Sequence, residues 1–385
     1  MDIKTIHEGL VEIKTPEFHK ISSKAPVFYN PAMELNRDLS ILAIKTFEQE
    51  LEQEISICDA FGGSGIRGVR YAREIDNVSN VVISDINPLA IQCAKENIEI
   101  NNLDNVKVYR EDANILLRKC RGKFDVVDID PFGTPSPFIE SAGISLKAGG
   151  MICATATDTS ALCGTYKEPC IRKYSAKPLK TEYCHEIGIR ILAGFIARTL
   201  SKYKKCIEMK FAHSSEHYMR IYATISKGAK ITDESLKNIG YILHCDNCLN
   251  RAVVKGFAPL TPAKCPVCSK NFKIAGPLWC GNILDSTFID GMIKNMETTK
   301  INQEKKACKL LKMTQIESKA PPTHYDLHEA SKNLKISAPR LDDVLDSLEE
   351  RGFFASRTHF KPTGIKTDAP VTVLKEIITA LHIKD

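Results

Sequence analysis

The chain has 385 residues, of which 43% are hydrophobic and 26% charged, values that are ordinary for a folded globular protein and exclude a disordered or fibrous chain. The formal net charge of +6 suits a polyanionic partner but does not require one. No run approaches the ~20 apolar residues of a membrane span, and the first residues lack the apolar core of a signal peptide. We therefore expect a cytoplasmic protein without a membrane partner, and we infer no obligate protein partner.

Residues 1–53 are predicted to be an N-terminal extension that packs on the following domain. Residues 10–14 have the pattern of a strand, and residues 38–53 have the pattern of a helix.

Residues 54–228 are predicted to be the second domain, because short apolar strands alternate there with amphipathic helices. This pattern is typical of a parallel α/β sheet. One helix begins at Asn87-Pro88, with proline at the first helical position. The first five strands are expected at residues 55–60, 81–85, 106–110, 124–130 and 151–157.

The end of this domain indicates which kind of α/β sheet it is. After a long helix at residues 182–203, strands at 206–212 and 218–225 are separated by a link so short that they must be antiparallel. A parallel sheet that ends in an antiparallel hairpin distinguishes class I methyltransferases from nicotinamide-binding sheets. We read the long basic segment 158–181 as a substrate loop or, equally, as a solvated basic surface.

Residues 229–385 differ in composition from the residues before them and are predicted to be a C-terminal α+β domain. It contains paired cysteines at about 241–275, a helix at 304–316 and a winged-helix-like segment at about 322–365. The second helix of that segment carries acidic side chains that would repel phosphates. If the module contacts nucleic acid, the wing residues Arg357, Lys361 and Lys366 are better candidates, and a role in packing alone is equally plausible.

Cysteine spacing predicts a metal site in this domain. Four of the fourteen cysteines form two Cys-x-x-Cys pairs separated by sixteen residues, the spacing of a zinc ribbon. Four thiolates close a tetrahedral site without an open position, so the expected zinc is structural. The predicted ligands are Cys245, Cys248, Cys265 and Cys268. The other cysteines are scattered among apolar neighbours, which argues against a disulfide framework.

A glycine-rich motif predicts a nucleoside-type cofactor. Gly63-Ser-Gly65-Ile-Arg67-Gly68 follows a strand and opens a helix, and Asp85 ends the next strand, where it can accept hydrogen bonds from ribose hydroxyls. After the third strand, Asp112 could accept from an adenine amine and the Ala113 N–H could donate to the ring, although an acid here is more often a turn residue. The motif alone does not distinguish NAD from S-adenosylmethionine.

The string Asp130-Pro131-Phe132-Gly133 at the end of the fourth strand indicates the chemistry. Ligands of open α/β sheets bind beyond such strand ends. An exocyclic amine is a poor nucleophile until acceptors hold its hydrogens, and Asp130 with the carbonyl of Asp130 or Pro131 can do this while Phe132 stacks on the base. The alternative is a strand-ending turn with Phe132 in the core.

Together with Phe28-Tyr-Asn-Pro and Asn36-Arg37-Asp38, these motifs resemble the tRNA guanine-26 N2-dimethyltransferase family in its compact archaeal form, over nearly the whole chain. The resemblance implies S-adenosylmethionine as cofactor and tRNA as partner. It places Arg37 and Arg67 near the cofactor carboxylate, Asp85 at its ribose, and Asp112 and Ala113 at its adenine. The implied substrate contacts are Asp130 and Pro131 at the guanine amine, with Phe28 and Phe132 sandwiching the base.

Three functions therefore remain open at this point. The favoured one is dimethylation of guanine 26 in tRNA. The second is another amino-methyltransferase, acting on ribosomal RNA guanine or on adenine. The third is a non-catalytic zinc-ribbon and winged-helix binding protein, which would leave the glycine loop and Asp130-Pro131-Phe132 unexplained. A nicotinamide oxidoreductase is a weaker hypothesis than any of these three.

Overall fold

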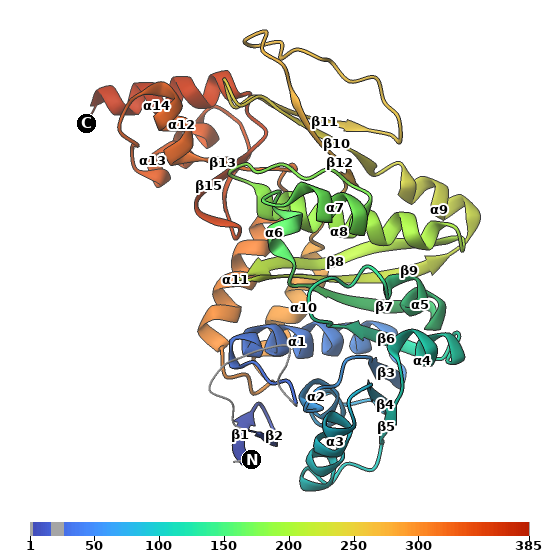
Figure 1. Cartoon of the computed structure of the whole chain (residues 1–385). Helices are drawn as coiled ribbons and strands as arrows, with labels where there is room; N and C mark the ends of the chain where they lie inside the picture. The colour runs from blue at the N-terminus through green and yellow to red at the C-terminus, as the bar shows by residue number, and fades with distance from the viewer. Residues whose placement is uncertain (1–2, 17–26, 385) are drawn as a thin grey trace.

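The computed structural model describes residues 3–16 and 27–384 of the chain. Its centre is a seven-stranded sheet in the order β5-β4-β3-β6-β7-β9-β8 (Figure 1). The strands are β3 (Ile55–Asp59), β4 (Val78–Asp85), β5 (Val106–Arg110), β6 (Phe124–Ile129), β7 (Leu146–Ala156), β8 (Lys205–Ser215) and β9 (Tyr218–Lys227). The first five are parallel, and β9 is antiparallel to both β7 and β8. The predicted class I methyltransferase sheet with an antiparallel final hairpin is thus confirmed.

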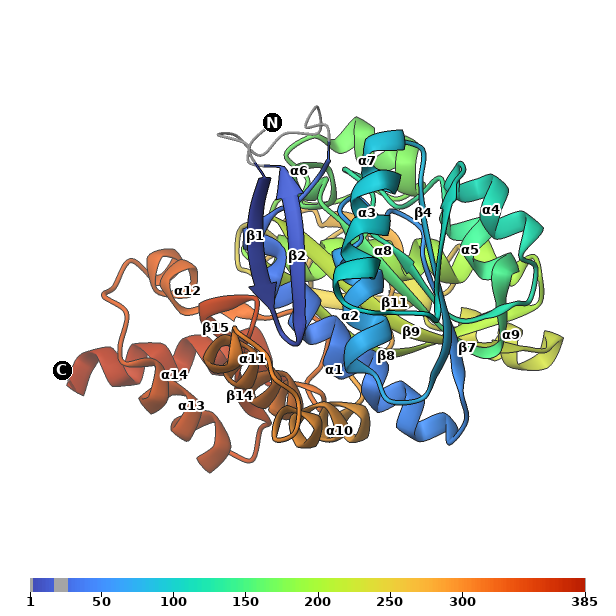
Figure 2. The same ribbon diagram turned by 90° about the horizontal axis from the view of Figure 1, so that it is seen from below.

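Helices cover both faces of the sheet. One layer holds α1 (Glu34–Leu51), α2 (Ile66–Glu74) and α3 (Pro88–Ile100), which contact one another in that order (Figure 2). The other holds α4 (Ala113–Lys119), α5 (Ile139–Ser145) and α8 (Cys184–Ser201), again in contact in that order. Asn87 caps α3 by accepting from the Leu89 N–H at 3.0 Å, as the Asn-Pro signal predicted.

The structure adds a partner strand to one sequence prediction and corrects another. The N-terminal strand is one half of a hairpin of β1 (Ile3–Glu8) and β2 (Val11–Pro16). The segment 158–181 is not a plain loop, because it contains α6 (Thr159–Leu162) and α7 (Lys167–Tyr174). Pro169 is compatible with α7 because it lies in the first turn, where no backbone N–H partner is lost.

The C-terminal region has two small sheets and six helices among the described residues. The first sheet, of order β11-β10-β12, holds the paired cysteines at one end, and the second, of order β13-β15-β14, carries the wing. The bounds are α9 (Ala229–Leu236), β10 (Ile239–His244), β11 (Arg251–Lys255), β12 (Lys273–Trp279), α10 (Ser286–Met296), α11 (Glu304–Glu317), β13 (Tyr325–Asp326), α12 (Leu327–Leu334), α13 (Leu341–Glu350), β14 (Ala355–Thr358), β15 (Lys361–Thr367) and α14 (Val371–Lys384).

Two clusters of buried apolar side chains stabilise these layers. The larger extends from Val11 to Leu311, because α10 and α11 pack beside α1 and so join the core of the large sheet. The smaller extends from Leu249 to Ile378 and fills the winged-helix-like part. No helix of the described ranges is long and apolar enough to cross a membrane.

Candidate active site

A pocket of about 440 Å³ lies at the carboxyl ends of β3, β4 and β6. The strand order reverses between β3 and β6, and such switch points are where open α/β sheets bind ligands. The predicted site residues that line it are Phe28, Gly63, Asp85, Asp112, Ala113, Asp130, Pro131 and Phe132. Gly65, Arg37 and Arg67 are buried and are not among the lining residues.

The glycine loop brings the backbone close to the pocket. Gly63 has φ +53°, and a Cβ there would lie 3.0 Å from the Phe28 carbonyl oxygen. Gly65 has φ +80°, and a Cβ there would lie 2.9 Å from the Ala94 Cβ. Both positions therefore favour glycine for its backbone freedom and its small size.

Asp85 holds the loop in place. One carboxylate oxygen accepts from the Gly63 N–H at 2.9 Å, and the other accepts from the Asn87 N–H at 2.9 Å. These bonds aim the carboxylate at the pocket, and each oxygen retains a second lone pair for a hydroxyl donor. The ribose role of Asp85 stays a prediction.

Asp112 is the N-cap of α4, because one of its oxygens accepts from the Asn114 N–H at 2.9 Å and the Ile115 N–H at 3.2 Å. This is the local role that an acid after a strand often has. The cap also positions Ala113, the first helical residue, against the pocket.

Asp130 is oriented by a buried arginine. The Arg67 Nε donates to the Asp130 Oδ2 at 2.7 Å, and the Arg67 Nη2 lies 2.5 Å from the same oxygen. Arg67 is itself held by Asn36, whose Oδ1 accepts at 2.7 Å. Since both Arg67 contacts end on Oδ2, the arginine fixes the carboxylate through one oxygen.

A second buried carboxylate supports this pair from behind. Asp128 accepts from Arg220 at 2.7 and 2.9 Å and from the Tyr71 hydroxyl at 2.5 Å, and Arg67 Nη1 lies 3.7 Å away. Burial alone would raise the pKa of Asp128, but Arg220 and Arg67 together lower it, so the group stays ionised.

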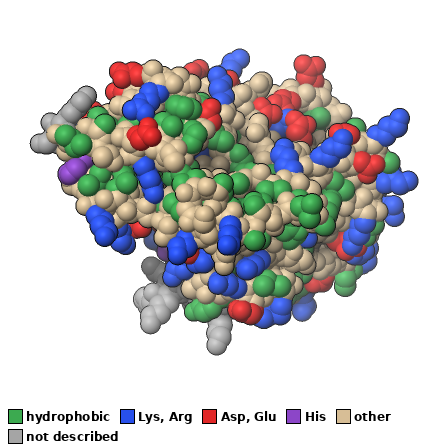
Figure 3. Space-filling model, turned by 90° about the horizontal axis from the view of Figure 1, so that it is seen from above, with side chains coloured by type: hydrophobic (Ala, Val, Ile, Leu, Met, Phe, Trp, Pro, Cys, Tyr) green, Lys and Arg blue, Asp and Glu red, His purple; other side chains and the backbone are tan. Residues whose placement is uncertain are grey.

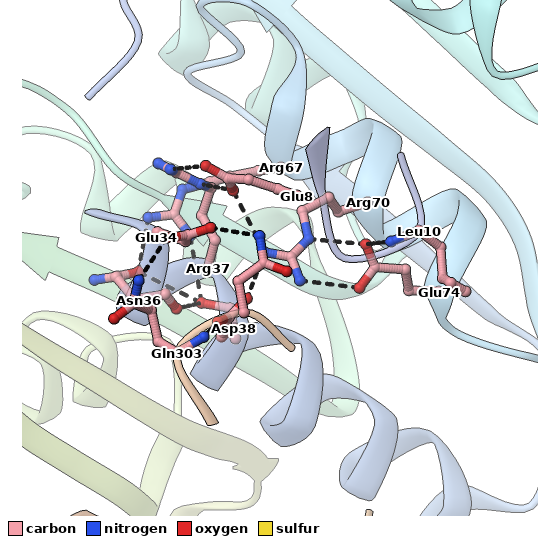
Figure 4. A network of polar contacts seen from close by, with 12 residues as sticks. Glu8, Leu10, Glu34, Asn36, Arg37, Asp38, Arg67, Arg70, Glu74 and Gln303 are labelled. Atoms are coloured by element: carbon pink, nitrogen blue, oxygen red, sulfur yellow. Dashed lines mark hydrogen bonds and ion pairs between the residues drawn. The ribbon is translucent and has the colours of Figure 1, made fainter. Parts of the chain in front are cut away.

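Arg37 also has a protein partner. Its Nε donates to the Glu8 carboxylate at 2.7 Å, and its Nη1 donates to the Asn30 carbonyl at 3.1 Å. Glu8 further accepts from the Tyr29 hydroxyl at 2.8 Å. Figure 4 shows how this contact continues through the paired charges of α1 and α2. The binding of the cofactor carboxylate by Arg37 and Arg67 stays a prediction. In that role each guanidinium group would bind the cofactor carboxylate in addition to the protein partners described above.

The two predicted stacking rings meet at the mouth of the pocket. The centroids of Phe28 and Phe132 are 4.4 Å apart, and the rings are edge to face at 77°. Phe132 is 56% exposed, so it is not the core residue of the alternative interpretation. A base can enter between the rings only if one of them turns away. Gly133 gives the Phe132 segment space, because a Cβ there would meet no atom within 4 Å.

The four paired cysteines converge as predicted. The Sγ atoms of Cys245 and Cys268 are 3.4 Å apart, and those of Cys248 and Cys265 are 3.5 Å apart. Each pair forms a knuckle, in which the Leu249 N–H donates to the Cys245 carbonyl and the Ser269 N–H to the Cys265 carbonyl, both at 2.8 Å. Four converging thiols are the donor set of structural zinc.

The wing residues are less available to nucleic acid than the sequence suggested. Lys366 is 2% exposed and bonded to Glu186 at 2.9 Å, so the prediction for Lys366 is wrong. Lys361 pairs with Asp326, and Arg357 pairs with Asp342 at 2.6 Å.

Sequence reasoning assigned no role to several residues that shape the site. Glu8 and Asn36 hold the two arginines, Thr157 accepts from the Gly133 N–H at 2.8 Å, and Tyr71 and Arg220 hold Asp128. Only Arg220 carried a local signal, since a single arginine in an otherwise apolar strand pattern indicates a buried charge pair.

Comparisons with known proteins agree with this geometry. The family described as N2,N2-dimethylguanosine tRNA methyltransferase matches residues 9–379. A tRNA (guanine(26)-N(2))-dimethyltransferase of Methanobrevibacter smithii is 58% identical, with 98% of each chain covered. One of Methanothermobacter thermautotrophicus is 52% identical over 98% of this chain and 99% of its own. The solved complex of Trm1 from Pyrococcus horikoshii with S-adenosyl-L-methionine has a TM-score of 0.88 at 35% identity, covering 97% of this chain and 99% of that one.

Proposed function

The chain belongs to the N2,N2-dimethylguanosine tRNA methyltransferase family, and from that premise we propose how it works as a tRNA (guanine26-N2)-dimethyltransferase. It methylates the exocyclic N2 of guanine 26 in tRNA, giving N2-methylguanosine and then N2,N2-dimethylguanosine. The observation that carries the mechanism is the Asp130 carboxylate, held on one oxygen by Arg67 at the edge of the pocket beside Phe28 and Phe132.

The pocket residues fit S-adenosylmethionine. Asp85 is a carboxylate aimed at the pocket, suited to ribose hydroxyls, while Asp112 and Ala113 border the place proposed for adenine. When bound, S-adenosylmethionine supplies an electrophilic methyl group on a sulfonium sulfur. The Gly63 loop allows this ligand to approach the backbone closely, because no side chain stands there.

Asp130 prepares the guanine amine. The lone pair of N2 is delocalised into the ring, and acceptors for its N–H groups make it available for attack. Because Arg67 occupies Oδ2, we assign Oδ1 of Asp130 and the Pro131 carbonyl as those acceptors. The amine loses one proton with each methyl group that it gains, and Asp130 is the group placed to accept it.

The aromatic pair holds the base. We propose that guanine replaces the contact between Phe28 and Phe132, with one ring on each of its faces, so that stacking contributes about 1–3 kcal/mol per ring contact. A guanine within folded tRNA has to leave its stack to reach this pocket, at a cost of a few kcal/mol. Stacking between the two rings offsets that cost.

The C-terminal part, residues 229–385, is proposed to support tRNA binding and to hold structural zinc at the four ribbon cysteines. Figure 3 shows the face at the top of Figure 1, where Lys and Arg side chains, interspersed with Asp and Glu, border exposed hydrophobic side chains. Such a surface suits a phosphate backbone with accessible bases. A tRNA substrate also supports the cytoplasmic location expected from the sequence.

The test is product analysis. The full chain is incubated with labelled S-adenosylmethionine and an unmodified tRNA transcript, and nucleosides are quantified by mass spectrometry over time. N2-methylguanosine is expected to rise and fall as N2,N2-dimethylguanosine accumulates. A matched transcript with adenine at position 26 should take up no label. A plateau at the monomethyl nucleoside, or label on adenine or cytosine, would contradict the assignment.

A further inference from the structure

A second group of metal-ligating side chains lies outside the pocket and outside the ribbon. The ligand atoms of Cys163, Cys184 and His185 all lie within 4.8 Å of one another. Within residues 3–16 and 27–384, this group and the ribbon cysteines are the two that bring three or more such side chains together. None of the three has a part in the proposed methyl transfer.

The three side chains come from two separate elements. Cys163 ends α6, where its N–H donates to the Thr159 carbonyl at 2.7 Å. Cys184 and His185 begin α8, and the Cys184 Sγ lies 4.0 Å from the His185 Nδ1. The chain must approach closely here, since a Cβ on Gly164 would lie 2.8 Å from the Leu179 backbone. The convergence therefore results from tertiary packing of α6 against α8.

The spacing of the donor atoms suits a tetrahedral metal ion. With Zn–S bonds of about 2.3 Å and Zn–N bonds of about 2.0 Å, tetrahedral ligands are separated by roughly 3.5–3.8 Å. The ribbon sulfurs, at 3.4 and 3.5 Å, already have nearly this spacing, and the second group, whose ligand atoms lie within 4.8 Å of one another, must contract to reach it. Two thiolates and one divalent ion are neutral together, so binding leaves no unpaired charge beside the buried Cys163.

We propose that Cys163, Cys184 and His185 bind a second zinc ion, with a water molecule as the fourth ligand. Sulfur and imidazole donors favour Zn²⁺ over Mg²⁺ or Ca²⁺. The ion reaches the site from the side of His185, which is exposed, while Cys163 is buried.

The ion would fasten the segment that frames the active site. Residues Thr157 and Asp158 lead directly into α6, and Thr157 both lines the pocket and binds Gly133. Asp158 accepts from the Tyr174 hydroxyl of α7 at 2.7 Å. Joining the end of α6 to the start of α8 therefore limits movement of the pocket edge next to Phe132.

Metal content of the full chain tests the proposal without tRNA or S-adenosylmethionine. Protein purified with a reductant, loaded with Zn²⁺ and dialysed, is analysed by elemental mass spectrometry. Two equivalents of zinc per chain are expected for the wild type, and one for Cys184→Ser and Cys163→Ser. Cys206→Ser, a matched change outside both groups, should retain two. Cys245→Ser should lose the ribbon ion and retain the second, which separates this proposal from that for the ribbon.

His185→Ala tests the same site with a smaller risk of misfolding, because His185 is exposed and its removal leaves the core intact. Its zinc content should fall from two equivalents to one. In a Co²⁺-loaded sample, the thiolate-to-cobalt absorption of Cys163→Ser/Cys184→Ser should fall by about a third, since two of six cobalt–thiolate bonds are lost. A wild type with one equivalent of zinc, unchanged by Cys184→Ser and His185→Ala, overturns the proposal. A disulfide between Cys163 and Cys184 that forms in protein purified with a reductant and then loaded with zinc overturns it as well.

Discussion

Asp130 is held by a protein partner through one oxygen, which leaves its other oxygen for the guanine amine proposed above. Its Oδ2 faces Arg67, which is buried among Asn36, Ser40 and Asp128, while the residue borders the pocket. The arginine holds the carboxylate through Oδ2 and so fixes its rotamer, which gives the other oxygen a defined direction. A carboxylate on a flexible surface loop would lack this orientation.

Replacing Asp130 should therefore affect the chemical step. We expect Asp130→Ala to lower kcat by about 10²–10⁴-fold, the usual range for a lost acid–base group. The dissociation constant of S-adenosylmethionine should change little, because Asp130 is assigned to the guanine amine. Single-turnover kinetics and isothermal titration calorimetry measure the two quantities. Asp76→Asn, at an exposed position, is the control, and an equal loss of cofactor affinity and rate would refute the division of roles.

Asp85 should give the opposite result. Asp85→Ala removes the proposed acceptor of the ribose hydroxyls and the acceptor of the Gly63 N–H. A hydrogen bond to a charged group contributes about 1.5–3 kcal/mol, so the dissociation constant of S-adenosylmethionine should rise by about 10- to 150-fold. The rate at saturating cofactor should fall much less. An unchanged dissociation constant would count against the ribose role.

At the level of elements, the pairing of two strands creates an acidic pair. β3 and β6 run parallel, and their register sets Asp59 opposite Asp128. Both side chains are fully buried, and Asp128 stays ionised because Arg220 and Arg67 lower its pKa. Burial, with the charge of Asp128 added, raises the pKa of Asp59 to about 7. The folded chain therefore carries a proton on Asp59 that the unfolded chain releases near pH 4.

This raised pKa predicts a pH dependence of stability. Between about pH 4 and pH 7 the folded state holds more protons at Asp59 than the unfolded state, so the contribution of Asp59 to the free energy of unfolding falls as pH rises, and it is constant above pH 7. A tenfold difference in the acid dissociation constant between the two states corresponds to about 1.4 kcal/mol.

Asp59→Asn removes this titration, and other groups cancel in the comparison. The variant should gain stability relative to the wild type as pH rises from 5 to 7, and the gain should level off by about pH 8. Urea unfolding at each pH measures the difference. If the free energies of unfolding of the two proteins differ by the same amount at every pH in this range, Asp59 does not retain its proton.

At the level of the whole molecule, a buried charge network joins the catalytic sheet to the C-terminal part. Lys366 of β15 lies 2.9 Å from Glu186 of α8 and 3.4 Å from Glu317 of α11. His359 donates to Glu317 at 2.6 Å. Although burial opposes it, His359 and Lys366 lower the pKa of Glu317 to about 2. Lys366 and Arg190 likewise lower the pKa of Glu186, which pairs with Arg190 at 2.9 Å, so both carboxylates are charged and share the same lysine.

Replacing Lys366 should lower the free energy of unfolding by weakening the contact between the catalytic sheet and the C-terminal part. Lys366→Met keeps the length of the side chain but leaves Glu186 and Glu317 with less compensation, and breaking a buried pair in this way costs about 3–5 kcal/mol. Denaturant unfolding should show this loss at pH 7, and Lys332→Met, at an exposed position, should change stability by less than about 0.5 kcal/mol. A loss as small as that of the control would show that packing alone holds the two parts together.

The sequence by itself determined the features that are local. The alternation of strands and helices, the Asn-Pro start of α3 and the spacing of the ribbon cysteines were all readable because each depends on neighbouring residues and on backbone periodicity. The position of Asp130 was readable for the same reason, since an acid that ends a strand and is followed by proline and phenylalanine is a local pattern, whereas the exposure of Phe132 was not.

Only the tertiary structure decided the partners of these side chains. That Arg67 points to Asp130 and Arg37 to Glu8, and that Cys163 meets Cys184, depends on contacts between segments distant in sequence. An arginine or cysteine is compatible with many partners, and strand register and helix packing select one. The pairing of Asp59 with Asp128 has the same origin, because a shift of the register by one residue would separate the two carboxylates.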